Sequence, residues 1–305
     1  LDPDAYPIID WQDQLMTGNG FTHNHTLSMS AGSERIRVMT SLGYLDQNGI
    51  IKNANFKRYN LRNNMDIRMN DRLNFRLDIA ATYSRRAANP YQSSVFGFMN
   101  SKDPLMLAQW SDGSYAPFTG GTVNPLPMIE QGVGGNNIRQ NGVLKASAAL
   151  EYKPVQWLTL EVKAAPQLTA VKTHRFVDLV EYHSDPYGTV SKTSNAEYNS
   201  LDETVTAAWN GYYHATAAAT RQFGGHSFKL LVGASYEEYD YYSLGAYRQE
   251  FAYPDYEVIS AGGDNEFKDN SGSRTQMALG SFFGRINYNF KERYLFEANL
   301  RYDGS

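Results

Sequence analysis

The sequence predicts an all-β fold, specifically an antiparallel up-and-down transmembrane β-barrel with about ten strands in this chain. Two observations predict it. Apolar and polar residues alternate along long segments, and the connections between these segments alternate between short and long. Outer-membrane barrels show both patterns, because each strand faces lipid on one side and a wet lumen on the other, with tight turns at one end and long loops at the other.

The clearest alternation lies in residues 57–83. Tyr59, Leu61, Met65, Ile67 and Met69 fall on one face up to Asn70-Asp71, a pair suited to a tight hairpin turn, and the apolar alternation then resumes. The intervening positions carry arginines and carboxylates. Each strand is about a dozen residues long, whereas soluble strands usually have about five or six. On this hairpin alone, a membrane barrel and a large soluble sandwich fit about equally well.

The rest of the chain repeats the pattern. We expect further strands near 22–31, 35–45, 142–153, 157–171, 203–223, 227–249, 274–290 and 294–302. Residues 1–21 are an irregular lead-in. Long loops are expected near 46–56, 88–141, 172–202 and 250–273, all on the extracellular side, because short turns separate them. This regular order of connections favours the barrel over a sandwich.

Aromatic residues collect beside the short turns, where the interface between membrane and water is expected. Amphipathic rings prefer the headgroup level of a bilayer. The predicted interfacial aromatics are Tyr152, Trp157, Phe223, Phe228, Phe290 and Tyr294.

Composition narrows the class of protein. The 305 residues have a formal net charge of −4 with dispersed basic residues, so nucleic acid is not an expected partner. Cysteine is absent, which excludes disulfides and thiolate chemistry. No apolar stretch approaches the roughly 20 residues of a membrane-spanning helix. The first residues lack the features of a signal peptide, so we expect either that it was removed or that the chain is an interior piece.

Four segments resemble one family in particular. They read IDWQD (9–13), HNHTLSMSAGSE (23–34), SLGYLDQNGIIKNANFKRYNLRNN (41–64) and FFGRINYNFKERYLFEANLRYDGS (282–305). The chain is similar here to the SusC-like (SusC/RagA) TonB-linked transporters of Bacteroidetes outer membranes. The resemblance implies that residues 22–305 form part of a TonB-dependent-receptor barrel and that residues 1–21 follow a plug domain absent from this chain.

The same resemblance carries expectations about function. It implies energised import of large nutrients, usually glycans and sometimes peptides, across a Gram-negative outer membrane. Its implied partners are outer membrane lipid, a SusD-like surface lipoprotein and the TonB complex, the last through segments that this chain lacks. Two alternatives stay open on the residues alone: a soluble or secreted β-protein that binds carbohydrate, and an outer-membrane barrel hydrolase.

No motif supports catalysis or a cofactor. The sequence has no nucleophile elbow, P-loop or zinc signature, so we expect a protein that is not an enzyme and has no catalytic, metal or cofactor site. His23 and His25 would share a strand face but have no third ligand nearby. His174, Asp178, Glu181, His183 and Asp185 crowd one expected long loop, where a solvated polar surface is the simpler interpretation.

Two groups of residues are singled out for function. The first is a set of charges expected to face the lumen and to pair across strands or with a plug, namely Arg58, Arg62, Asp66, Arg68, Arg76 and Asp78. The second is a loop set that suits stacking on sugar rings or contact with a lid, namely Trp110, Asp112, Tyr115 and Phe118. For this second set, packing between loops is the simpler alternative.

Overall fold

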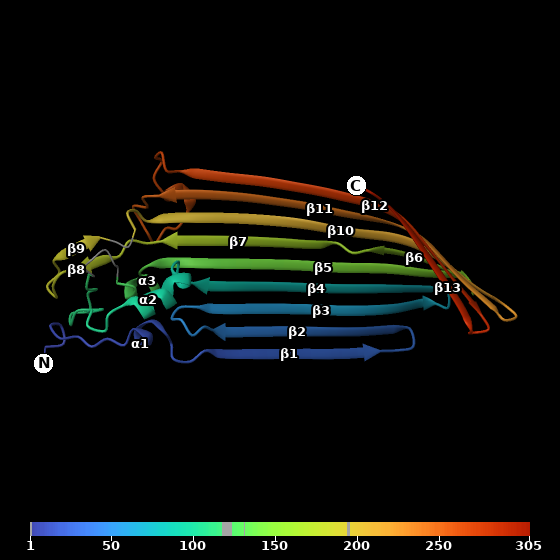
Figure 1. The fold of residues 1–305 in the computed structure, drawn as a ribbon, viewed down its shortest axis with the longest axis horizontal. Helices are drawn as coiled ribbons and strands as arrows, with labels where there is room; N and C mark the ends of the chain where they lie inside the picture. The colour runs from blue at the N-terminus through green and yellow to red at the C-terminus, as the bar shows by residue number, and fades with distance from the viewer. Residues whose placement is uncertain (1, 118–123, 131, 194–195) are drawn as a thin grey trace.

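One large antiparallel sheet dominates the computed structural model, which describes residues 2–117, 124–130, 132–193 and 196–305. The strands follow chain order across the sheet (Figure 1). β7 occupies the same position as β6 further along, between β5 and β10, so the sheet has ten strand positions. The predicted fold class, an antiparallel up-and-down sheet of about ten strands, is confirmed.

The strands of this sheet are β1 (Phe21–Gly32), β2 (Ile36–Asn48), β3 (Asn55–Asn70), β4 (Leu73–Ala88), β5 (Gly135–Val155), β6 (Leu158–Ala164), β7 (Gln167–Val177), β10 (Ser200–Phe223), β11 (His226–Gln249), β12 (Asp269–Phe290) and β13 (Tyr294–Gly304). A separate hairpin consists of β8 (Glu181–His183) and β9 (Val190–Thr193). The helical elements are α1 (Trp11–Leu15), η1 (Gln92–Ser94), α2 (Val95–Ser101), α3 (Leu126–Ile129) and η2 (Ile259–Ala261). Within the described residues, no helix is long and apolar enough to span a membrane.

The two ends of the sheet differ in their connections. Tight turns gather at one end, on the right of Figure 1, and the long connections with helices α1 to α3 and the β8–β9 hairpin gather at the other. We call these the turn end and the loop end. The short and long connections that alternate along the sequence therefore lie at opposite ends of the sheet in the structure.

Strand register aligns like side chains across the whole sheet. Leu42 pairs with Leu61 and Leu61 with Ala81, and the same row continues through Leu144 to Leu168. Because side chains alternate between faces, this places the apolar residues of every strand on one face, which we call the apolar face. The charged residues between them lie on the opposite, polar face.

The apolar side chains are exposed, as lipid contact requires. Leu27 is 59% exposed, Leu230 is 48% exposed and Leu300 is 79% exposed. A soluble protein rarely leaves an apolar surface of this extent uncovered, whereas a barrel turns it toward lipid. The polar face, by contrast, contains the buried side chains Ser235 and Ser281.

Most strands run further toward the loop end than the apolar pattern predicted. β5 begins at Gly135 rather than near 142, β12 begins at Asp269 rather than near 274, and β7 continues to Val177. The connections are accordingly shorter than the loops expected near 46–56, 88–141, 172–202 and 250–273, and they span 49–54, 89–134, 178–199 and 250–268. Apolar alternation marks only the lipid-facing part of a strand, while backbone pairing continues above it.

One expected strand is interrupted. The segment near 157–171 divides into β6 and β7 around Ala165 and Pro166, because proline lacks the N–H that the ladder would use. Neighbouring strands close the gap: the amide of Ala165 donates to the carbonyl of Tyr212 at 2.7 Å, and the amide of Ala146 donates to that of Pro166 at 3.0 Å.

The lead-in of residues 1–21 is less irregular than expected. Asp10 caps α1 by accepting from the amides of Gln12 at 2.9 Å and Asp13 at 3.2 Å. The buried Trp11 of this helix packs with Val95 and Ile129 in a small core formed by the loop-end segments. The sequence analysis missed this helix because five residues are too few for a helical period to show.

The two faces of β4 make a direct prediction. Leu77 lies on the apolar face, between Leu73 near the turn end and Tyr83 toward the loop end, so Leu77→Arg places a charge near mid-membrane. We expect a cost of about 2–4 kcal/mol and a clear loss of assembled protein, measured as a heat-modifiable gel band. Asp78→Asn, on the polar face, is the matched control and should assemble normally. Equal losses would contradict the assignment of faces.

Candidate functional site

The candidate site is a groove on the polar face, close to the loop end. It exists because β5, β10 and β11 are long: β5 has 21 residues and β10 and β11 have 24 each, whereas about 9–11 residues cross a membrane. Their loop-end halves form a wall that begins behind the exposed apolar residues Val205 and Leu244 and extends past them to Asp202. The polar face of this wall is open to a solute.

The groove, which we call the polar groove, has a volume of about 600 Å³. Its lining is mostly hydroxyl, amide and charged groups with two tyrosines, namely Asn137, Arg139, Thr169, Val171, Thr173, Arg175, Asp202, Thr204, Thr206, Ala208, Asn210, Tyr239 and Tyr241. Register places these side chains together, because Asn137 pairs with Arg175 and Arg175 with Asp202 across three strands.

The polar groove offers both stacking surfaces and hydrogen-bonding groups. The rings of Tyr239 and Tyr241 are 6.4 Å apart between centroids and within 12° of parallel, so they form one aromatic surface. In the part of the chain that the structure describes, neither Arg139 nor Arg175 forms an ion pair. Their guanidinium groups are therefore available to a solute with hydroxyl or carboxylate groups. None of these residues was singled out from the sequence.

The six charges expected in the lumen all lie on the polar face of β3 and β4. Their partners are mostly local or amide groups. Arg68 forms an ion pair with Asp71 at 2.9 Å within the turn, and Arg62 donates to Asn64 at 3.1 Å. Asp78 accepts from Asn64, and Arg76 is paired with Glu161, two strand positions away. Only this last pair is an ion pair across strands of the kind predicted.

Loop packing occupies the aromatic residues of the 89–134 connection. The Trp110 Nε1 donates to the carbonyl of His183 at 2.6 Å, and the amide of His183 donates to the carbonyl of Tyr115 at 2.8 Å. The Tyr115 hydroxyl donates to Glu130, and burial followed by this hydrogen bond raises its pKa. Asp112 closes its own turn by accepting from Ser114. Phe118 lies outside the described residues.

His174 is not a loop residue, as the sequence analysis had placed it, but part of β7. Its two ring nitrogens lie 2.9 Å from Glu203 Oε1 and 2.5 Å from Glu257 Oε2. Lys172 also pairs with Glu203 at 2.8 Å, and Asn136 donates to Glu257 at 2.7 Å. These contacts fasten the 250–268 connection to the strands beyond the lipid-facing rows. The polar groove is not covered by it, because His174 and the groove lie on opposite faces of β7.

Hydrophobic contacts support the same attachment. Phe251 packs edge-on against Phe176, with centroids 5.4 Å apart, and Leu201 is fully buried beside them. Asn199 holds the backbone of Phe251 through both its amide and its carbonyl oxygen, at 2.9 and 2.7 Å. The 250–268 connection is thus anchored both at His174 and at the neighbouring Phe176.

Aromatic residues border the apolar face at both ends. At the turn end, the predicted residues Phe290 and Tyr294 stack at 6.4 Å, and the guanidinium of Arg221 lies 4.3 Å above the Trp157 ring. Tyr152, Phe223 and Phe228 are exposed near the same turns.

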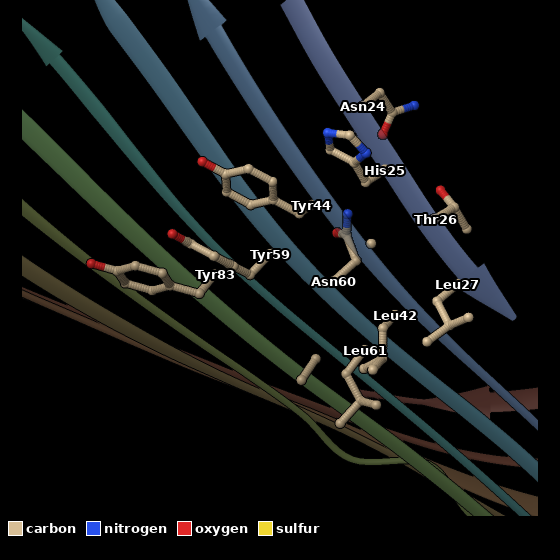
Figure 2. Close-up of a pocket in the computed structure, with 12 residues that line it drawn as sticks. Asn24, His25, Thr26, Leu27, Leu42, Tyr44, Tyr59, Asn60, Leu61 and Tyr83 are labelled. Atoms are coloured by element: carbon tan, nitrogen blue, oxygen red, sulfur yellow. The ribbon is translucent and has the colours of Figure 1, made fainter.

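The second border was not predicted. It is a row formed by His25, Tyr44, Tyr59 and Tyr83, one from each of β1 to β4 (Figure 2). On β4 the turn-end border lies at Leu73, which pairs with Tyr152, and the second border lies at Tyr83. These ten residues, at about 3.3 Å per residue and a tilt of about 40°, span roughly 25 Å, the height of an outer-membrane apolar band.

No metal site is evident in the described residues, where no group of three or more His, Cys, Asp or Glu side chains could hold an ion. His23 and His25 stack 6.2 Å apart on β1.

The known proteins with similar sequences are TonB-dependent receptors. The chain is 27% identical to TonB-dependent receptor P26 of Formosa agariphila, over all of this chain and 30% of that receptor. It is 24% identical to TonB-dependent receptor SusC of Bacteroides thetaiotaomicron, over 97% of this chain and 30% of SusC. The chain thus spans about a third of these relatives. No family model matches it.

Solved structures share the fold. The RagAB peptide importer in its closed-closed state superimposes with a TM-score of 0.73 at 20% identity, over 96% of this chain and 33% of that one. The outer membrane transporter YddB from Escherichia coli gives 0.54 at 11% identity, over 93% of this chain and 34% of that one.

The His174 contacts predict a pH-dependent attachment of the 250–268 connection. The hydrogen bond to Glu257 is the largest influence on His174 and raises its pKa, although burial opposes the shift. Burial is the largest influence on Glu257 and raises its pKa, but the hydrogen bonds from His174 and Asn136 outweigh it and leave the pKa lowered.

Because the pKa of His174 is raised, its contribution to the stability of the attachment is complete below the ordinary histidine value of 6.5 and is lost as pH rises through the raised pKa. Because the pKa of Glu257 is lowered, its contribution is complete above the ordinary glutamate value of 4.5 and is lost as pH falls through the lowered pKa. The attachment is therefore most stable between pH 4.5 and pH 6.5. We expect hydrogen exchange of residues 251–261, corrected for intrinsic rates, to speed up above that window. His174→Gln should remove the dependence, and a flat profile in the unaltered protein would contradict it.

Proposed function

We propose that the chain, which is similar to the TonB-dependent receptors P26 and SusC, forms part of an outer-membrane barrel wall that imports large nutrients, most of all glycans. The observation that carries the proposal is the polar groove, which lies on the face opposite the lipid-exposed residues. A solute passing through a barrel meets this face. Import and not catalysis is proposed, because the groove holds binding groups without an arrangement of nucleophile and base.

The chemistry of the polar groove favours a carbohydrate. The aromatic surface of Tyr239 and Tyr241 suits the apolar C–H face of a sugar ring, and the threonine, asparagine and aspartate groups around it suit sugar hydroxyls. Arg139 and Arg175 extend this to acidic sugars. A peptide is the second candidate, because the same guanidinium groups would bind carboxylates and because the RagAB structure of similar fold is described as that of a peptide importer.

The partners follow from the resemblance of the sequence. We propose that a SusD-like surface lipoprotein covers the loop end and that the TonB complex drives import through parts of the receptor outside this chain. Trp110, Asp112 and Tyr115 belong to the packed loop-end segments, which would offer the lid a preformed surface. Phe118 is proposed for the same surface on sequence grounds alone. This arrangement supports a structural role for the loop aromatics beside any contact with substrate.

The test uses the full-length receptor that carries this chain, purified and applied to arrays of defined oligosaccharides and peptides. We expect oligosaccharide binding that Tyr239→Ala/Tyr241→Ala weakens by about tenfold, since each ring contributes roughly 0.5–1.5 kcal/mol. Tyr242→Ala is the control, because this tyrosine is 46% exposed on the opposite face. If the receptor binds peptides and no oligosaccharide, the proposed substrate class is peptide and not glycan. Equal affinity of the double variant and the control for the oligosaccharide would contradict binding at the polar groove.

A further inference from the structure

Four arginines form a row on the polar face near the loop end of the sheet, one on each of β3, β4, β5 and β7. We call them the arginine row, and they are Arg58, Arg86, Arg139 and Arg175. Arg86 is the direct cross-strand partner of Arg139. Arg58 and Arg175 lie diagonal to these two, each displaced by two residues along its strand. Every arginine of the row therefore has the next one as a neighbour on the same face.

The positive charges of the arginine row are not neutralised within the part of the chain that the structure describes. None of the four side chains forms an ion pair or a hydrogen bond there. Those of Arg58, Arg86 and Arg139 are exposed. Like charges directly opposite each other on a sheet are destabilising, so the pairing of Arg86 with Arg139 carries a cost that no ion pair offsets. An anion bound along the row would remove this cost.

The acidic residues of the polar face lie apart from the arginine row. On β3, β4 and β5 they are eight residues or more nearer the turn end, namely Asp66, Asp78 and Glu151. At the loop end they lie beyond β7, on β10 and β12. Asp202 of β10 is opposite Arg175 in the register without forming an ion pair with it, and Asp269 of β12 lies two strands further on. The loop end of this face is thus positive across β3 to β7 and acidic only beyond them.

The arginine row continues the polar groove across two more strands. Arg139 and Arg175 line the groove, whereas Arg86 and Arg58 lie past it. The row runs obliquely, because its Arg58 end is four residues nearer the turn end than its Arg175 end. Three strand spacings of about 4.8 Å and four residues of about 3.3 Å place the two ends roughly 19 Å apart. This distance is too long for a single carboxylate to contact all four guanidinium groups.

We propose that the arginine row binds an oligosaccharide that carries a carboxylate or a sulfate on successive sugar units. A sugar ring at one end stacks on the tyrosine pair of the polar groove, and the anionic groups of the following units pair with the arginines in turn, toward Arg58. The planar guanidinium group binds carboxylates and tetrahedral oxyanions through two parallel hydrogen bonds, which suits a row made of arginine alone. The assignment rests on the proposed import function and adds to it the charge and the length of the substrate.

The first experiment uses the purified full-length receptor and an array in which every acidic oligosaccharide has a neutral counterpart. The pairs are oligogalacturonates with their methyl esters, and sulfated galactan oligosaccharides with their desulfated forms. We expect an acidic member to bind at least about tenfold more tightly than its counterpart. Its affinity should also fall as salt is added, because charges on an exposed face are screened. The two kinds of pair distinguish a carboxylate from a sulfate.

The second experiment removes only the part of the arginine row that lies outside the polar groove. Arg58→Gln/Arg86→Gln should weaken binding of the acidic oligosaccharide about tenfold, since each exposed charge pair contributes modestly and two are lost. Binding of the neutral counterpart should not change. Lys57→Gln/Arg85→Gln is the matched control, because it removes the same charge from the adjacent positions of the same strands on the opposite face. A heat-modifiable gel band checks that both variants assemble.

The outcomes separate the arginine row from the proposed function. If neutral and acidic members bind equally, or if the two double variants bind the acidic member equally, the arginine row is not a binding site, although glycan import stands. Tighter binding of oligoglutamate than of every acidic oligosaccharide would overturn the assignment to a sugar chain. If no oligosaccharide of either kind binds, the proposed function fails, and the assignment of the arginine row fails with it.

Discussion

The structure depends on the requirement that every backbone N–H and C=O inside a bilayer be hydrogen-bonded to another strand. Unpaired groups in hydrocarbon cost several kcal/mol each, so the strands must remain in register across the full apolar layer. Here β10 and β11 pair without interruption over 24 residues, and β11 and β12 pair over most of the same length. Register also fixes the faces, since a slip of one residue would turn every apolar side chain toward the lumen.

The remaining features follow from this ladder. Because pairing continues past the lipid-facing rows, the strands form one continuous wall, which carries the polar groove on one face and, at its loop end, the attached 250–268 connection on the other. Because register repeats from strand to strand, one tyrosine per strand becomes a continuous row. Where proline interrupts the ladder at Pro166, neighbouring strands take up the exposed groups. The same network of backbone hydrogen bonds thus positions both the polar groove and the lipid-facing side chains.

The fold was predictable because it depends on a local pattern, the alternation of apolar and polar residues along each strand. The alternation in β3 and β4 and the order of connections identified both the strands and the two ends of the sheet. Strand limits such as Gly135 and Asp269 were not predictable, since polar residues on both faces leave no alternation to detect. The break at Pro166 was within reach, because proline is known to interrupt ladders, but the apolar pattern on both sides of it continued.

The candidate sites were harder to predict for a different reason. Tyr239 and Arg175 are far apart in sequence and line the same groove only because of the register of three strands, which no local pattern specifies. The upper tyrosine row had a detectable signal, because Tyr44, Tyr59 and Tyr83 each stand at the loop-end limit of an alternating apolar run. His174 was assigned to a loop because its partners, Glu203 and Glu257, come from distant segments. Space also depends on register: a side chain at Gly233 would collide with the Phe283 ring, 2.5 Å away.

The central claim, that one face of a continuous sheet meets lipid and the other meets water, is tested most directly by spin labels placed singly at residues 73 to 83 of β4. In the membrane-inserted receptor, labels at odd positions should be more accessible to oxygen, which concentrates in lipid. Labels at even positions should be more accessible to a water-soluble nickel chelate. The account predicts this alternation with a period of two over the whole segment. Equal accessibility at adjacent positions, or the opposite phase, would contradict it.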